Sequence, residues 1–229
     1  MTAISLDLDE TLWRLNGVLE GAEAATVAFL REHYPAIAEA YPPERMRTVR
    51  DEIIAESPEI VYNVTALRIR TFERAAARAG VGAPSRVAEE AFEVFIAARH
   101  KVELYPDALP LLELLYQKVP LIALTNGNAD VHRLALGHYF VAAHSAVHVG
   151  AAKPSREMFD AASRSAGVPR ERIIHVGDDP VTDVTGAARH GLQPVWLNRY
   201  GAPWPADVPA VEYTEIRSLD ELPALIEWP

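Results

Sequence analysis

The chain has 229 residues, of which 32 are acidic and 22 are basic, and its formal net charge is −10. This charge disfavours nucleic acid and anionic membranes, so we expect neither as a partner. Hydrophobic residues make up 49% and charged residues 24% of the sequence, a balance typical of a globular protein. The lack of cysteine excludes disulfides and thiol catalysis and fits a reducing compartment. The sequence MTAISLDLDETL lacks a basic segment followed by an apolar run, and no long apolar stretch occurs, so we expect no export signal, no membrane span and a cytoplasmic location.

The first part of the chain changes from a strand pattern to a helical one. Residues 3–7 are typical of a short buried strand that delivers acidic side chains to the carboxyl edge of a parallel sheet. From about residue 21 to 104, apolar residues recur only at helical spacing, as in VTALRIRTFERAAARAG. We predict an inserted α-helical unit over residues 17–104, and a core formed by residues 1–16 and 105–229.

After Pro106 helical and strand patterns alternate. PDALPLLELLYQK precedes VPLIALT, SREMFDAASRSAG precedes RIIHVGD, and TDVTGAARHG precedes QPVWL. The alternation predicts an α/β fold with a doubly wound, parallel, Rossmann-like sheet. Right-handed crossovers place the ends of residues 119–125 and 173–177 at the same sheet edge as Asp7. The last, proline-rich stretch is expected to be a connection packed on the core, with a short helix over residues 218–226.

Two carboxylates, Asp7 and Asp9, follow the first strand, and Thr11 comes two residues later. Alternate side chains in such a loop can face one cavity. One carboxylate can attack phosphorus, while the other protonates the leaving oxygen and then activates water. Taken alone, the pattern is more often a solvated acidic turn.

Thr125, Asn126 and Gly127 end the second apolar strand. A hydroxyl and the backbone N–H groups that follow it can form an uncharged cradle for phosphoryl oxygens, with glycine allowing a close approach. An ordinary strand-to-helix turn explains the same residues equally well.

Lys153 stands directly before a helix start marked by Pro154 and Ser155. A single lysine is usually a solvated surface charge. Beside the cavity, it would neutralise a phosphoryl group and restrain the attacking aspartate.

Asp178, Asp179 and Asp183 surround the next strand end, in VGDDPVTDVTGAA. Together with Asp7 they form a set of hard oxygen ligands suited to Mg²⁺, and the missing cysteines and scattered histidines argue against zinc. The alternative is helix capping by Asp179, with Asp183 as a charge in the first turn.

The four motifs DLDET, LTNGN, KPSREMF and GDDPVTD occur in this order, each at an expected strand end. Over essentially the whole chain this arrangement resembles the haloacid-dehalogenase-like (HAD) hydrolase superfamily. The helical insert looks like the cap of that superfamily, of its first topological type. The resemblance implies an Mg²⁺-dependent phosphomonoester phosphatase that forms an aspartyl-phosphate intermediate.

The resemblance also implies a role for each motif residue. Asp7 would be the nucleophile and a Mg²⁺ ligand, and Asp9 the general acid and base, with its backbone carbonyl on the metal. Asp178 would be a further metal ligand. Thr125 and Lys153 would bind the phosphoryl group, with support from Asn126 and Gly127. Asp183 would orient Lys153 or metal-bound water. Thr11 and Asp179 would support the site.

A closer resemblance, carried by residues 57–80 of the insert and by LIALTNGNAD and IIHVGDDPVTDVTGAARHGLQPVWL, is to the bacterial riboflavin-pathway phosphatases. Those enzymes dephosphorylate a ribitylaminouracil precursor and also accept FMN. The resemblance therefore implies FMN or 5-amino-6-(5-phospho-D-ribitylamino)uracil as substrate. Candidate substrate contacts are Arg14, Tyr62, Arg68 and Trp13, the last of which stands where those relatives are expected to have tyrosine. Core or surface packing explains Trp13 and Arg14 equally well, and Arg68 could simply be solvated.

Other functions remain open. A sugar-phosphate phosphatase or a phosphomutase would carry the same four motifs. A 2-haloacid dehalogenase would need neither Asp9 nor Asp178, and a non-catalytic binding protein would be expected to have lost one of the motif residues. The sequence leaves a monomer and a homodimer equally open. The histidines, including His175 in a buried strand, are interpreted as core or surface residues.

Overall fold

The structure is a computed structural model that describes residues 2–226 and 228. The chain forms two compact units, a core unit of residues 1–14 and 103–229 and a cap unit of residues 15–102. The sequence placed these changes at residues 16/17 and 104/105. Among the described residues, no helix combines the length and the hydrophobicity needed to cross a bilayer.

The core unit is built on one six-stranded sheet in the order β3-β2-β1-β4-β5-β6, with every neighbouring pair parallel. This confirms the predicted doubly wound α/β fold. The strands are β1 (Ala3–Leu6), β2 (Leu121–Thr125), β3 (Ala142–Ser145), β4 (Ile173–Gly177), β5 (Gln193–Leu197) and β6 (Thr214–Ile216).

The three central strands, β1, β2 and β4, consist of continuously buried residues, as expected for a sheet covered on both faces. In their register Leu6 pairs with Ala123 on one side and with Val176 on the other. The residues that follow each strand therefore emerge together at one edge.

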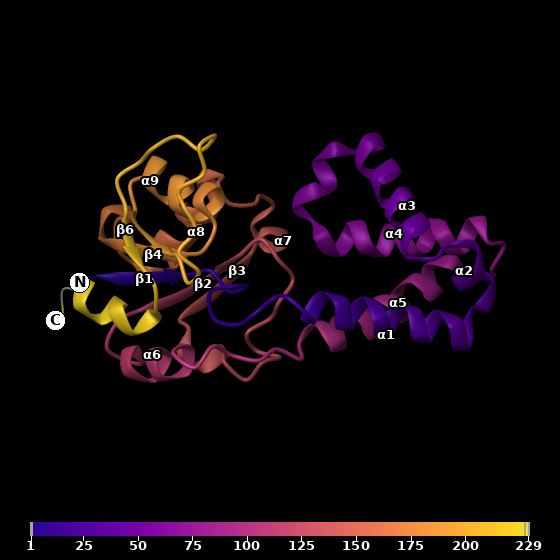
Figure 1. Cartoon of the computed structure of the whole chain (residues 1–229), viewed down its shortest axis with the longest axis horizontal. Helices are drawn as coiled ribbons and strands as arrows, with labels where there is room; N and C mark the ends of the chain where they lie inside the picture. Colours follow the sequence, from indigo (N-terminus) through magenta and orange to yellow (C-terminus); the bar gives the residue numbers. More distant parts are fainter. Residues whose placement is uncertain (1, 227, 229) are drawn as a thin grey trace. The chain divides into compact units, whose positions relative to one another are not determined.

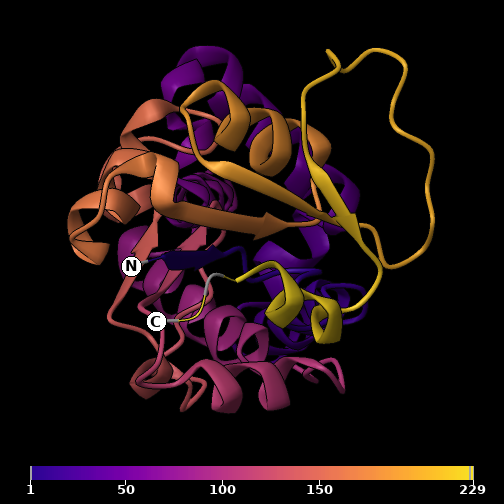
Figure 2. The same ribbon diagram turned by 90° about the vertical axis from the view of Figure 1, so that its left-hand side faces the viewer.

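Helices cover both faces of this sheet, as Figures 1 and 2 show. Helix α6 (Ala108–Leu115) and the C-terminal 3₁₀ helix η5 (Leu219–Leu225) lie on one face, and α8 (Arg156–Ala166) and α9 (Gly186–Arg189) lie on the other. The shorter elements are α7 (Ala146–Val149), the 3₁₀ turns η2 (Gly137–Tyr139) and η3 (Arg170–Arg172), and the π-helical turn η4 (Pro180–Thr185) before α9.

The cap unit is helical, as its apolar spacing predicts. It contains α1 (Val18–His33), α2 (Pro35–Ala40), α3 (Pro43–Glu56), the 3₁₀ turn η1 (Pro58–Tyr62), α4 (Val64–Arg78) and α5 (Pro84–Arg99). Asn63 caps α4 because its side-chain oxygen accepts a hydrogen bond from the Ala66 N–H at 2.8 Å. Buried side chains such as Leu30, Phe72 and Ala91 form the interior of this unit.

Candidate active site

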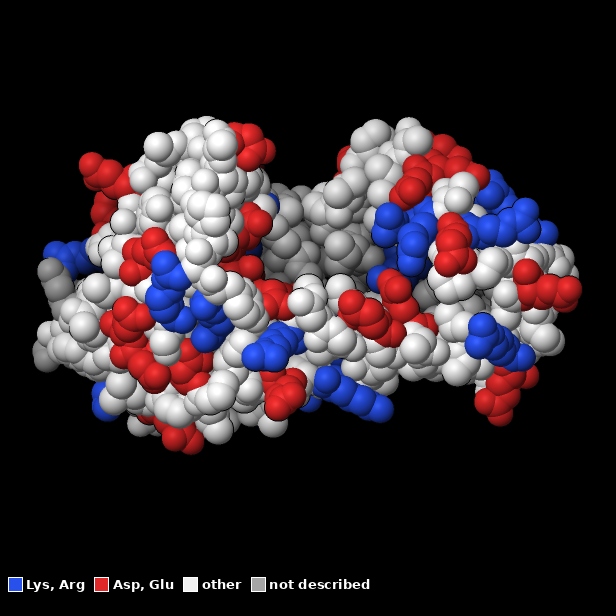
Figure 3. All heavy atoms as spheres, viewed as in Figure 1, with Lys and Arg blue, Asp and Glu red and all other residues white. Residues whose placement is uncertain are grey.

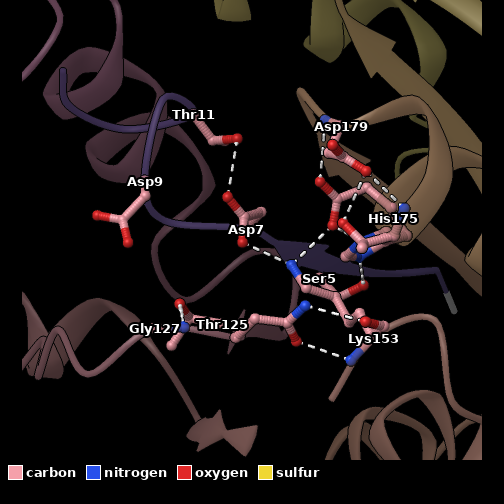
Figure 4. Close-up of polar contacts among 12 residues, drawn as sticks. Ser5, Asp7, Asp9, Thr11, Thr125, Gly127, Lys153, His175 and Asp179 are labelled. Carbon is pink, nitrogen blue, oxygen red and sulfur yellow. Dashed lines mark hydrogen bonds and ion pairs between the residues drawn. The ribbon is translucent and has the colours of Figure 1, made fainter. Parts of the chain in front are cut away.

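The candidate site lies at the carboxyl edge of the core sheet, where β1, β2 and β4 end. Asp7 follows β1, Thr125 ends β2, and Asp178 follows β4. Lys153, from the segment before α8, reaches the same place (Figure 4). The strand order thus brings together residues that are more than a hundred positions apart, as parallel doubly wound sheets do at their ligand sites.

Asp7 and Lys153 form a buried ion pair. The Lys153 ammonium donates to Asp7 Oδ1 at 2.5 Å and also contacts Asp183 Oδ1 at 2.7 Å. Burial favours the neutral amine, but the carboxylates of Asp183 and Asp7 outweigh it and raise the pKa of Lys153. Lys153, only 3% exposed, is therefore a fixed positive charge rather than a solvated surface lysine.

Asp7 and Asp178, the carboxylates that follow β1 and β4, lie where the ionised form is unfavourable. Burial and the neighbouring carboxylates raise the pKa of Asp7 to about 7, although Lys153 opposes the shift. Burial, followed by the charges of Asp7 and Asp183, raises the pKa of Asp178 to about 8. A bound cation would relieve this repulsion.

Asp7, Asp178 and Asp183 could hold that cation. One ligand atom from each lies within 4.8 Å of the others, and all three ligands are hard carboxylate oxygens. This donor set fits Mg²⁺ better than a soft or nitrogen-preferring metal. The Asp9 side chain is not part of this group.

Asp183 is held by two further groups besides Lys153. His175 Nε2 lies 3.1 Å from Asp183 Oδ1, and the Asp179 N–H donates to Asp183 Oδ2 at 3.1 Å. Burial lowers the pKa of His175, so the ring is neutral and donates a hydrogen bond to Asp183, while its Nδ1 pairs with the Ser5 hydroxyl at 2.8 Å (Figure 4). His175 is buried in the core, as interpreted from the sequence, and it also supports the site through Asp183.

Gly177 makes the position of Asp183 possible. A Cβ added to Gly177 would lie only 2.3 Å from the Asp183 carboxylate, closer than any real side chain allows. Packing against Asp183 therefore requires glycine at position 177. The backbone conformation does not, because the φ angle of Gly177 is not positive.

Thr125 and its neighbours form the turn expected after β2, but their side chains act on different partners. The buried Thr125 hydroxyl accepts a hydrogen bond from the Gly127 N–H at 2.9 Å. Asn126 instead binds the backbone of Lys153 twice, accepting from its N–H at 2.7 Å and donating to its carbonyl at 2.9 Å. The Asn126 side chain therefore positions the backbone of Lys153.

Asp179 caps the turn η4, as the helix-capping alternative predicted. Its Oδ1 accepts hydrogen bonds from the N–H groups of Val181 at 2.9 Å and Thr182 at 2.6 Å. The Asp178 backbone carbonyl accepts a hydrogen bond from the Trp196 indole at 2.9 Å, which fixes the start of this loop.

The loop after β1 folds back on itself, with Glu10 in the left-handed region at φ 58°. Thr11 Oγ1 lies 3.5 Å from Asp7 Oδ2, and the Trp13 indole N–H donates to Asp9 Oδ1 at 2.8 Å. Trp13 was a candidate substrate contact, with packing as the equal alternative, and its fully buried ring agrees with packing. Its indole N–H also holds the Asp9 carboxylate.

Two residues outside the four motifs clamp this loop. Arg199 donates to the Thr11 carbonyl at 2.8 Å and makes a two-point contact with Asp107 at 2.8 and 3.0 Å. Tyr105, whose ring lies under the Arg199 guanidinium, donates to Glu10 Oε2 at 2.9 Å. No local sequence pattern pointed to either residue.

The other candidate substrate contacts are Arg14, Tyr62 and Arg68. Arg14 is exposed at the end of the first core segment, with its guanidinium 5.7 Å from the centre of the Tyr105 ring. Tyr62 ends η1, and Arg68 lies on α4, where its guanidinium stacks on the Phe95 ring at 3.7 Å. The last two belong to the cap unit.

Residues 1–191 match the family model of haloacid dehalogenase-like hydrolases. The chain belongs to this family. The HAD-like hydrolase is 34% identical to the 5-amino-6-(5-phospho-D-ribitylamino)uracil phosphatase YigB of Escherichia coli (strain K12), over 86% of this chain and 83% of that protein. It is 38% identical to a phosphoserine phosphatase of Thermus thermophilus, over 58% of this chain and 55% of the relative.

Among solved structures, a 2-haloacid dehalogenase from Pseudomonas syringae pv. Tomato DC3000 matches this HAD-like hydrolase with a TM-score of 0.93 and 36% identity, over 98% of this chain and 97% of the other. The relatives thus include both phosphatases and a dehalogenase. The chain is an enzyme of a hydrolase family, and the reaction must be argued from the site.

Proposed function

We propose that this HAD-like hydrolase is an Mg²⁺-dependent phosphomonoester phosphatase that uses Asp7 as its nucleophile. The observation that carries the proposal is the group of Asp7, Asp178 and Asp183 around the buried Lys153 ammonium. A carboxylate nucleophile, a fixed positive charge and a set of hard oxygen ligands are together what phosphoryl transfer requires.

The proposed reaction has two displacements at phosphorus. An Asp7 carboxylate oxygen attacks phosphorus, the ester P–O bond breaks, and Asp9 gives its proton to the leaving oxygen. Asp9 then takes a proton from water, whose oxygen attacks the same phosphorus and releases inorganic phosphate and Asp7. When bound, Mg²⁺ would neutralise the phosphoryl oxygens beside the carboxylates.

The polar contacts give each supporting residue a part in this scheme. Lys153 would bind a phosphoryl oxygen while Asp183 and the Asn126 amide keep the lysine in place. The Thr125 hydroxyl, whose oxygen accepts a hydrogen bond from the Gly127 N–H, would donate its own hydrogen to a phosphoryl oxygen from the opposite side. Trp13 would restrain Asp9 between its two proton transfers.

For the substrate we propose FMN or 5-amino-6-(5-phospho-D-ribitylamino)uracil, with sugar phosphates as the alternative. The support is the 34% identity to the E. coli phosphatase that acts on the second compound. Tyr62 and Arg68 remain the predicted cap contacts to the heterocycle.

The test is a comparison of kcat/KM, with Mg²⁺ present, across the two ribityl phosphates, simple sugar phosphates, phosphoserine and p-nitrophenyl phosphate. A ribityl phosphate should have the highest kcat/KM, and Arg68→Met should reduce this kcat/KM more than that of p-nitrophenyl phosphate. A higher kcat/KM for a sugar phosphate, or an equal loss for both compounds in Arg68→Met, would contradict the substrate assignment.

The 36% identity to a dehalogenase structure makes dehalogenation the second candidate. In that reaction Asp7 would attack carbon and displace halide, and water would then attack the carboxyl carbon of the resulting ester. In ¹⁸O-water, a dehalogenase would acquire label in Asp7, whereas the proposed phosphatase places label only in the released phosphate. Halide release from a 2-haloacid, with ¹⁸O in the Asp7 peptide, would favour the dehalogenase.

A further inference from the structure

The cap unit contains a cavity of its own. Its volume is about 230 Å³, and it is lined by residues of α1, α3 and α4 and of the segment between α2 and α3. Leu30, Leu67 and Phe72, all buried, give it an apolar floor. This volume is below the range of sites for drug-sized ligands, so the cavity suits a small molecule with one or two aromatic rings.

Basic side chains line the rim of this cavity. Arg31 on α1, Arg47 and Arg50 on α3 and Arg68 on α4 take part in its lining, against one carboxylate, Glu23. Figure 3 shows basic side chains gathered over the part of the cap that contains α3 and α4. In a chain with a net charge of −10, such a rim is complementary to an anion.

Arg68 is the basic residue whose surroundings point most directly to a ligand. Its guanidinium stacks on Phe95 at 3.7 Å, and burial lowers the pKa of Arg68. Within residues 2–226 and 228 its ion-pair partner is the Glu23 carboxylate, at 3.9 Å, which lies beyond hydrogen-bond distance. The Arg68 side chain remains 29% exposed, so its N–H groups can be reached from the cavity, and an oxyanion there would receive charge-assisted hydrogen bonds from them.

We propose that the cap cavity binds a small organic anion in which a flat apolar body carries an oxyanion group. The oxyanion would pair with Arg68, and the apolar body would lie against Leu30, Leu67 and Phe72. Binding in the cap requires neither the metal nor Asp7, so this inference holds or fails independently of the proposed reaction, although Arg68 is also the predicted cap contact to the substrate.

The test uses naphthalene-1-sulfonate as the probe, titrated by calorimetry into the full-length Asp7→Asn variant without divalent cations. One site per chain is expected. The neutral analogue 1-naphthol should bind about tenfold or more weakly, since it lacks the charge-assisted hydrogen bonds. Equal affinity for both probes would overturn the proposal.

Two arginines of α4 provide a matched pair of variants. Arg68→Met should weaken naphthalene-1-sulfonate binding at least about tenfold, because it removes the guanidinium proposed to bind the sulfonate. Arg70→Met removes the same charge from an exposed position on the same helix that does not line the cavity, and should change the affinity by less than about twofold. Equal weakening by both substitutions would show a long-range charge effect and overturn the proposal.

Val27→Trp tests the location independently of charge. Val27 lines the cavity from α1, and a tryptophan there would fill the space that the naphthalene ring occupies. Loss of the site, with an unchanged circular dichroism spectrum, is expected. Binding that persists in Val27→Trp would place the probe elsewhere and contradict the inference.

Discussion

The charged groups at the candidate active site of the core differ in burial and pairing from those around the cap cavity. In the core, Lys153 and Asp183 are almost fully buried and contact each other directly. In the cap, Arg31 and Arg47 are exposed, and Arg68 lies against an aromatic ring, with the Glu23 carboxylate beyond hydrogen-bond distance. The core charges are therefore fixed by each other, whereas the arginines around the cap cavity are accessible to a ligand.

We expect the largest loss of activity from a substitution of Asp7, the proposed nucleophile in the core unit. Asp7→Asn should reduce kcat by roughly 10⁴-fold or more, because an amide cannot form the acyl phosphate. Asp207→Asn, in an exposed loop, is the matched control and should keep normal activity. Substantial phosphatase activity in Asp7→Asn, measured with p-nitrophenyl phosphate, would refute the nucleophile assignment.

Removal of the divalent cation should have a comparably large effect. EDTA should abolish activity, because the phosphate dianion would otherwise approach Asp7, Asp178 and Asp183 against strong repulsion. Added Mg²⁺ should restore activity, and Asp178→Asn should require at least about tenfold more Mg²⁺ for half-maximal rate. Activity that survives excess EDTA would argue for the dehalogenase reaction.

Asp9→Asn is expected to reduce kcat/KM by about 10²- to 10⁴-fold for alkyl phosphates such as a ribityl phosphate. The loss should be much smaller for p-nitrophenyl phosphate, whose leaving group departs without protonation. Because kcat/KM reports the first displacement, the comparison isolates the acid role of Asp9. An equal loss for both substrates would indicate that Asp9 acts on binding or structure instead.

Trp13→Phe should have the smallest effect of the series, about three- to tenfold on kcat/KM for an alkyl phosphate. The substitution keeps an aromatic ring but removes the N–H that Asp9 accepts. If Trp13 acts through Asp9, the substitution should add nothing in the Asp9→Asn background. Additive losses in the double variant would show that Trp13 serves only as packing.

Three of the four motifs were readable from the sequence because they stand at the ends of β1, β2 and β4, and strands with continuous apolar residues are easy to recognise. The motif that contains Lys153 follows the short helix α7 instead. The edge strands β3 and β6 were not predicted. β3 consists of small and polar residues, AAHS, and β6 has only three residues, of which one is buried. Neither carries a hydrophobic pattern that distinguishes it from a loop.

The sequence also did not predict the supporting contacts between residues that are far apart along the chain. Arg199 reaches the Thr11 carbonyl across 188 positions, and His175 reaches Asp183 only because η4 turns back over Gly177. For Trp13 the sequence left substrate contact and packing equally open, since nothing in its neighbourhood revealed that its indole N–H would bind Asp9. These contacts depend on tertiary packing, which local spacing does not encode.

The most direct test of the proposed mechanism is chemical trapping of the phosphorylated enzyme. The Asp9→Asn variant should accumulate the intermediate from p-nitrophenyl phosphate, because the good leaving group departs while water is no longer activated. After acid quench, borohydride reduces an acyl phosphate to an alcohol, which converts the phosphorylated aspartate to homoserine. The mechanism predicts homoserine at position 7 in the peptide map. Release of p-nitrophenol with Asp7 unmodified and homoserine at another aspartate would contradict it.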